Sequence, residues 1–138
     1  MSTRDVARQE RRETALLIFI ALLGTFIPQR LYLHLVNPNA DAFLFGYNVH
    51  HLFTGAVIEI PAATLLALRV GGIWTRRIAA VAFGSGSAMV LDEVVYLITT
   101  DGSNQAYLTP VSLWGAVVLV GVMAFSLACY LAVMKPEQ

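Results

Sequence analysis

Four long apolar segments, separated by short polar turns, most constrain how this chain folds. They run approximately over residues 14–36, 47–70, 77–98 and 110–134 of the 138-residue sequence. Each is close to the roughly 20 residues that a helix needs to cross about 30 Å of hydrocarbon. The chain is also 57% hydrophobic and only 13% charged, outside the usual range for soluble domains. The sequence therefore predicts an all-α integral membrane protein with a single domain.

The connections between these segments predict an up-down-up-down four-helix transmembrane bundle. Residues 37–41, 71–72 and 99–104 are rich in Gly, Asn and Asp, which are typical of turns. Connections this short favour consecutive helices that pack side by side and antiparallel. In the third segment, Gly84 and Gly86 would let helix backbones approach closely.

Basic residues lie on one side of the predicted membrane. Arg4, Arg8, Arg11 and Arg12 precede the first segment, Arg69, Arg76 and Arg77 flank the second turn, and Lys135 follows the last segment. The first and third turns contain no Lys or Arg. The positive-inside rule therefore predicts a multi-pass protein of the cell (inner) membrane with both termini in the cytoplasm.

Ionisable residues inside the predicted spans gather in the outer half of the bundle. They are Arg30, His34, His50, His51, Glu59, Asp92 and Glu93. A rotation of about 100° per helical residue lets all of them except His50 face inward together. His50 points about half a turn away from Glu59 and fits a position among lipid headgroups. Ionisable residues within a membrane normally pair with one another or form a functional site.

The balance of charge in this group predicts a metal. Three carboxylates and one guanidinium leave a negative surplus, which a low dielectric disfavours. Protonated carboxyls, cationic histidines or a divalent cation would remove it. Imidazole with carboxylate is a common ligand set for zinc, iron or manganese. The sequence thus predicts a divalent-metal site near the extracytoplasmic end, with ligands from His34, His51, Glu59, Asp92 and Glu93.

Each residue also has a structural interpretation. Arg30 is expected to be the ion-pair partner of Asp92 or Glu93 at similar depth rather than a ligand. The two acidic residues would alternatively be a helix-packing pair satisfied by Ser and Tyr hydroxyls. Glu59, if protonated, would donate to a backbone carbonyl freed by Pro61, since proline removes a backbone donor.

Three classes of function remain open. As an enzyme, the protein would act on a lipid-soluble or periplasmic substrate, with Glu59 or Glu93 as the catalytic proton-transfer group. As an accessory or structural subunit, it would use the polar residues for internal cohesion. As a transporter it would pass metal ions or protons, although the inner halves of the spans lack a polar relay. The sequence ranks these in the order metalloprotein, accessory subunit, transporter.

The remaining residues predict the role of the fourth segment and the contacts of the protein with lipid and partners. The fourth segment has no ionisable group, so it is expected to be scaffold or the face of a homo-oligomer or larger membrane complex. Trp74, Trp114, Tyr47 and Tyr107 lie near predicted span ends, as in an aromatic belt in contact with the lipid bilayer. Cys129 is expected to be a small apolar filler. The zero net charge gives no indication of nucleic-acid binding.

Two short motifs resemble those of a known group of proteins. The segments HHLFTG in the second span and GSGSAMVLDE in the third are similar to segments of small four-span membrane proteins of bacteria and archaea. The resemblance covers about half of the chain. It implies that His51, Asp92 and Glu93 act as a unit, and it implies no particular chemistry.

The predicted orientation is testable by thiol labelling. Single cysteines introduced near Asp41 and Asp101 should react with a membrane-impermeant reagent in intact cells, because both turns are expected outside. Labelling that requires permeabilisation would reverse the orientation and the depth of every polar residue.

Overall fold

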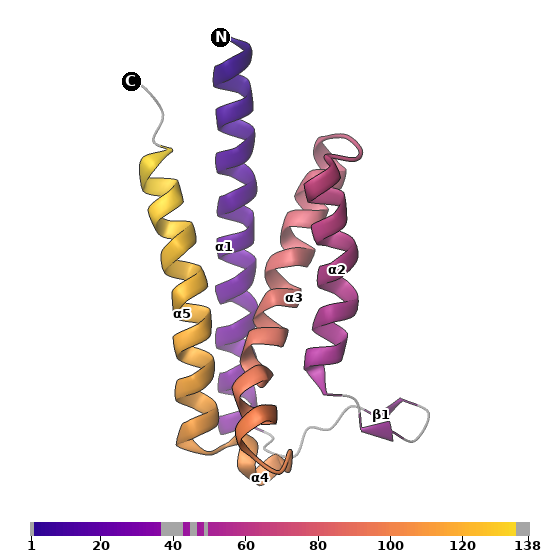
Figure 1. The fold of residues 1–138 in the computed structure, drawn as a ribbon, viewed down its shortest axis with the longest axis vertical. Helices are drawn as coiled ribbons and strands as arrows, with labels where there is room; N and C mark the ends of the chain where they lie inside the picture. Colours follow the sequence, from indigo (N-terminus) through magenta and orange to yellow (C-terminus); the bar gives the residue numbers. More distant parts are fainter. Residues whose placement is uncertain (1, 37–42, 45–46, 49, 135–138) are drawn as a thin grey trace.

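The computed structural model describes residues 2–36, 43–44, 47–48 and 50–134 (Figure 1). Its elements, in chain order, are α1 (Thr3–Leu35), β1 (Phe43–Leu44), β2 (Tyr47–Asn48), α2 (His51–Leu68), α3 (Ile73–Thr99), α4 (Asn104–Tyr107) and α5 (Pro110–Val133). Within these described ranges, α1, α2, α3 and α5 are the helices long and apolar enough to cross a membrane. The prediction of a helical fold with four such helices is confirmed.

Several elements differ from the sequence prediction, including the start of α3, which is Ile73 rather than residue 77. Helix α1 begins well before residue 14, because the Ser2 hydroxyl accepts from the Asp5 amide at 3.2 Å and the Asp5 carboxylate accepts from the Ser2 amide at 2.7 Å. This reciprocal capping box satisfies amides that have no partner within the helix. Helix α2 begins at His51, because Tyr47–Asn48 pairs with β1 in a small antiparallel hairpin. The short helix α4 was not predicted.

Helix α3 is the centre of the molecule. It packs against α1, α2 and α5, and α1 also contacts α5. In its most apolar stretch 44% of residues are buried, against 11–17% in the other three long helices. Among the four long helices that the structure describes, α2 packs against α3 alone. The expectation that consecutive helices pack together is therefore wrong for α1 and α2, since the connection between them contains a hairpin and is more than a tight turn.

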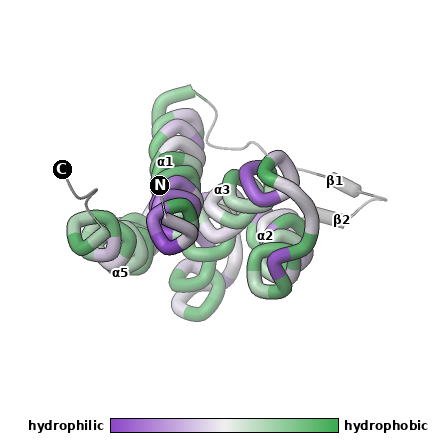
Figure 2. The backbone as a smooth tube through the Cα atoms, turned by 90° about the horizontal axis from the view of Figure 1, so that it is seen from above, coloured by the Kyte–Doolittle hydropathy of each residue, from purple (hydrophilic) through white to green (hydrophobic). Residues whose placement is uncertain are grey.

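The long helices alternate in direction, so the start of α1 and the end of α5 lie at the same end of the molecule (Figure 1). A hydrogen bond from Arg8 Nη2 to the Val133 carbonyl, at 3.4 Å, joins these two ends. Large apolar side chains face outward on the four long helices, with Val57 73% exposed and Phe125 71% exposed. Figure 2 shows the same predominance of hydrophobic residues along the helices. This outer surface suits contact with lipid rather than water.

Two glycines of α3 mark its closest approaches to its neighbours. A Cβ atom on Gly86 would lie 2.7 Å from the Gly55 carbonyl oxygen of α2. A Cβ atom on Gly84 would lie 2.5 Å from the Ile18 carbonyl oxygen of α1. Small residues allow this backbone contact, which stabilises helix pairs in lipid through close van der Waals packing. Each glycine therefore positions a different helix against α3.

Replacement of Gly86 by alanine should separate α2 from α3. The new methyl group would meet backbone atoms that cannot rotate away, so we expect a loss of about 1–3 kcal/mol in the free energy of unfolding. Gly121 of α5, where an added Cβ has no neighbour within 4 Å, is the matched control. Gly121→Ala should be neutral or slightly stabilising, because alanine favours helix. Denaturant unfolding in detergent, followed by circular dichroism, measures both, and equal effects would contradict this packing.

Candidate functional site

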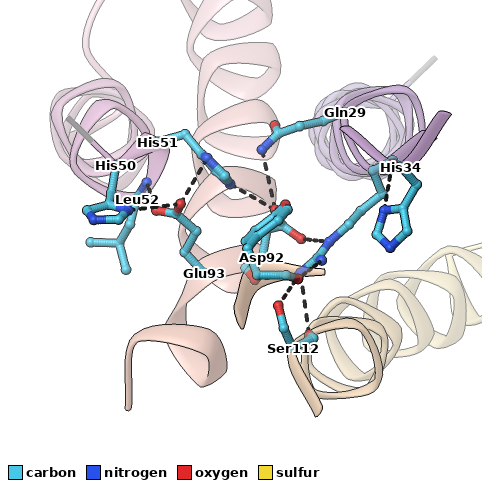
Figure 3. Close-up of polar contacts among 10 residues, drawn as sticks. Gln29, His34, His50, His51, Leu52, Asp92, Glu93 and Ser112 are labelled. Atoms are coloured by element: carbon cyan, nitrogen blue, oxygen red, sulfur yellow. Dashed lines mark hydrogen bonds and ion pairs between the residues drawn. The ribbon is translucent and has the colours of Figure 1, made fainter. Parts of the chain in front are cut away.

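The carboxylate of Asp92, on α3, is the centre of a buried polar network at the end of the molecule opposite the termini. Asp92 is 1% exposed. Its Oδ1 accepts from Arg30 Nε, and its Oδ2 accepts from the Tyr107 hydroxyl. The same Oδ2 lies 2.8 Å from His51 Nε2 and accepts from Gln29 Nε2 at 3.3 Å (Figure 3). One carboxylate thus connects α1, α2 and α4 to α3.

Arg30, on α1, connects the network to α4 and α5. Its guanidinium donates to the Tyr107 carbonyl at 3.3 Å, to the Asp92 carbonyl at 3.1 Å and to the Ser112 hydroxyl at 3.2 Å. Its central carbon lies 4.1 Å from the centre of the Tyr107 ring. A side chain that is only 5% exposed therefore has hydrogen-bond acceptors and an aromatic face around its charge.

Glu93 caps helix α2 from the neighbouring helix. His50, the N-cap residue of α2, makes no side-chain capping bond of its own. Instead the Leu52 amide donates to Glu93 Oε2 at 2.8 Å. A carboxylate at a helix N-terminus satisfies a free amide and interacts favourably with the helix dipole. Glu93 is 3% exposed, so this contact lies inside the protein.

His51 lies between the two carboxylates. Its Nε2 faces Asp92, and its Nδ1 is 3.0 Å from Glu93 Oε1. An imidazole presents an N–H group on both ring nitrogens only in its protonated form. His51 thus contacts both acidic side chains, one through each ring nitrogen.

His50 faces the same carboxylate oxygen. Its Nδ1 is 3.4 Å from Glu93 Oε1, and its ring centre is 6.0 Å from that of Tyr96. The sequence analysis set His50 apart because it used the angle to Glu59, whereas its position at the start of α2 brings it to Glu93. The side chains of His50 and His51 are both 25% exposed, so this is the part of the network nearest the surface.

Two of the five predicted metal ligands lie outside the network. His34 Nδ1 donates to the Arg30 carbonyl of its own helix at 3.0 Å, and its ring points away from Asp92 in Figure 3. Glu59 accepts a hydrogen bond from Ser87 at 2.8 Å, next to the contact of α2 with α3. The structure therefore brings together three of the five: His51, Asp92 and Glu93.

The ligand chemistry does not point to a bound metal. Among the described residues, no group of three or more His, Cys, Asp or Glu side chains is arranged to hold a metal ion. Both nitrogens of His51 face carboxylates, and the oxygens of Asp92 accept from Arg30 and Tyr107. Metal binding stays a prediction that would need these contacts to rearrange.

Sequence reasoning missed three members of the network. Tyr107 was assigned to an aromatic belt, but it is 7% exposed and lies inside the site, as do Gln29 and Ser112. Burial and the nearby Asp92 raise the pKa of the Tyr107 phenol, so it stays a hydrogen-bond donor. The one feature of the sequence that could have indicated these residues is the position of Gln29, a polar residue next to Arg30 within an apolar segment. Tyr107 reaches the site because α4 folds back against the C-terminal end of α3.

Comparisons with protein-family models, with curated proteins and with solved structures found no match to this chain. The resemblance based on the HHLFTG and GSGSAMVLDE segments therefore stays a prediction. The function has to be argued from the geometry of the site itself.

The pairing of Arg30 with Asp92 predicts strong energetic coupling between these residues. Arg30→Met should destabilise the protein by about 3–5 kcal/mol, because it leaves a buried carboxylate without its cation. In combination with Asp92→Asn, the total loss should be clearly smaller than the sum of the single losses.

Glu93→Gln provides the control for this double-mutant cycle, because Glu93 makes its contacts with α2 and none with Arg30. Its effect should be closer to additive with that of Arg30→Met. Denaturant midpoints of the purified variants supply the values. Equal coupling of Arg30 to both acidic residues would show that it responds to total charge rather than to one partner.

Proposed function

We propose that this chain is a multi-pass protein of the cell membrane with both termini in the cytoplasm. The four long apolar helices support membrane insertion. Arg4, Arg8, Arg11, Arg12, Arg69, Arg76 and Arg77 occur at the end that holds the start of α1 and the turn between α2 and α3 (Figure 1). The positive-inside rule assigns that end to the cytoplasm. The polar network then lies at the extracytoplasmic end.

We further propose that the network serves cohesion, in an accessory or structural membrane protein. Helix α2 has one packing neighbour among the long helices described, α3, so the N-terminal end of α2 depends on contacts made by its first residues. Those residues are His50, His51 and Leu52, and all three contact Asp92 or Glu93. In lipid the hydrophobic effect does not drive helices to associate, so polar contacts and close packing hold them together.

The observation that carries this proposal is the position of His51 between two buried carboxylates. Its two ring nitrogens lie 2.8 Å from Asp92 Oδ2 and 3.0 Å from Glu93 Oε1, while Arg30 contacts Asp92 and the Leu52 amide donates to Glu93. Both carboxylates therefore have partners within the protein, and polar groups that are satisfied in this way stabilise the contact between helices. Glu59 lies outside the network, so the negative surplus expected from the sequence is smaller there.

An acid–base role for His50 is the second candidate. Glu93 lies against Nδ1 of His50, which is how a carboxylate orients an imidazole for proton transfer. In the described part of the chain, Nε2 of His50 has no hydrogen-bond partner, and the side chain is one-quarter exposed. A substrate from the outer leaflet or from the space beyond it would meet His50 and His51 at the exposed edge of the network, and of the two His50 has the ring nitrogen that is free among the described residues.

An accessory protein needs a surface for its partner, and α5 offers one. Val118, Val122 and Phe125 are 60%, 61% and 71% exposed on this helix. Their spacing of three and four residues places them on one face. Cys129, the only cysteine of the chain, is also exposed on α5, so a short thiol-reactive cross-linker can report on self-association through this helix.

Metal content and stability together test the cohesion proposal. Protein purified in detergent should contain no stoichiometric zinc, iron or manganese, and a chelator should leave its thermal midpoint unchanged. His51→Ala should lower the midpoint markedly, because it removes the one side chain that contacts both buried carboxylates.

His50→Ala is the matched control at the neighbouring position and should have a much smaller effect on stability. Elemental analysis and thermal scans with and without chelator are measured on all three proteins. A stoichiometric metal that His51→Ala removes would reject the cohesion proposal in favour of the metal site. A larger loss in His50→Ala would instead show that His50 is the main contact of α2.

A further inference from the structure

A cavity of about 650 Å³ lies at the arginine-rich end, far from the polar network. Its walls come from the first half of α1, the end of α2, the start of α3 and the last part of α5. Helices α1 and α2 both line it, although they do not pack against each other along their length. The volume lies within the range of sites that bind small molecules.

The polar side of this cavity is basic. Arg11, Arg69 and Arg76 line it, with Glu10 as the one acidic residue. Arg76 Nη1 pairs with Glu10 at 2.9 Å. Its Nη2 is buried and has no hydrogen-bond partner in the described part of the chain. The Arg76 side chain is 27% exposed at the cavity, so Glu10 occupies only part of the hydrogen-bonding capacity of this guanidinium.

The remaining walls are apolar. Ile18 of α1, Leu65 and Leu66 of α2 and Leu127 of α5 lie on the side toward the middle of the helices. Figure 2, seen from this end, shows hydrophilic residues at the start of α1 and around the turn between α2 and α3, with hydrophobic residues behind them. The cavity is therefore polar and cationic near the ends of the helices and apolar toward their middle.

We propose that this cavity binds an anionic phospholipid, with the phosphate against Arg11 and Arg76 and an acyl chain along the apolar wall. A guanidinium matches a phosphate in charge and hydrogen-bond geometry. Basic pockets between helices at the cytoplasmic side of membrane proteins recognise anionic headgroups. The proposal does not depend on the role of the polar network. Only the leaflet that supplies the lipid depends on the orientation proposed above.

Native mass spectrometry tests this site. The protein is released from nanodiscs that contain equal amounts of phosphatidylglycerol and phosphatidylcholine, and the lipid that stays bound is identified. We expect one phosphatidylglycerol to be retained in preference to phosphatidylcholine. In Arg11→Gln/Arg76→Gln its affinity should fall about tenfold or more, since each arginine near an anionic headgroup contributes roughly 1 kcal/mol.

The matched control is Arg12→Gln/Arg77→Gln, which removes the same charge from neighbouring positions that do not line the cavity. Arg77 pairs with Glu13 much as Arg76 pairs with Glu10, so both double variants lose one similar ion pair. The control should retain the lipid at the level of the original protein. Equal loss in both double variants, or equal retention of the two lipids, would overturn the proposal.

Two further measurements keep the result interpretable. Circular dichroism establishes that the variants are folded, and Arg11→Gln alone replaces the double variant if that protein does not fold, since Arg11 makes no helix-cap contact. Inorganic phosphate at millimolar concentration should not displace the bound lipid, because it cannot fill the apolar wall. Displacement by phosphate would show that the cavity is an anion site and would overturn the assignment to a lipid.

Discussion

The ion pair between Arg30 and Asp92 is the interaction on which the polar half of this structure, opposite the termini, depends. A single charge buried among apolar helices is strongly destabilising, so each of these residues requires the other. Their contact fixes α1 against α3, and the second oxygen of Asp92 then receives His51 from α2 and Tyr107 from α4. The contacts of Asp92 thus hold three helices and the short α4 together around one buried carboxylate.

The two ends of the molecule differ in how they hold α2. At the end opposite the termini, Asp92 and Glu93 contact the start of α2, and glycines set its close contact with α3 further along. At the end that holds the start of α1, α1 and α2 line a cavity whose arginines exceed its acidic residues. Helix α2 is therefore attached by polar contacts at one end and lines a cavity at the other.

The buried part of the network holds the helices together, and its partly exposed part is open to contact with other molecules. Arg30 and Asp92 are almost completely buried, so they have no access to a substrate. His50 and His51 retain one-quarter exposure and share one oxygen of Glu93. Proton transfer, if the protein performs it, belongs to these histidines, with the buried pair holding them in place. A metal would need His51 to give up at least one of its carboxylate contacts, because a ligand nitrogen must be deprotonated.

The sequence by itself determined the four long helices, the side on which the arginines lie and the inward position of Arg30, Asp92 and Glu93. Length, hydropathy and helical rotation are local properties, so they follow from the order of residues. Only the tertiary structure decided which polar residues meet. Glu59 lies apart because the crossing of α2 and α3 fixes how far one helix is displaced along the other. Tyr107 joins the site through the fold of α4, since rotation along one helix specifies neither displacement between helices nor the path of a connection.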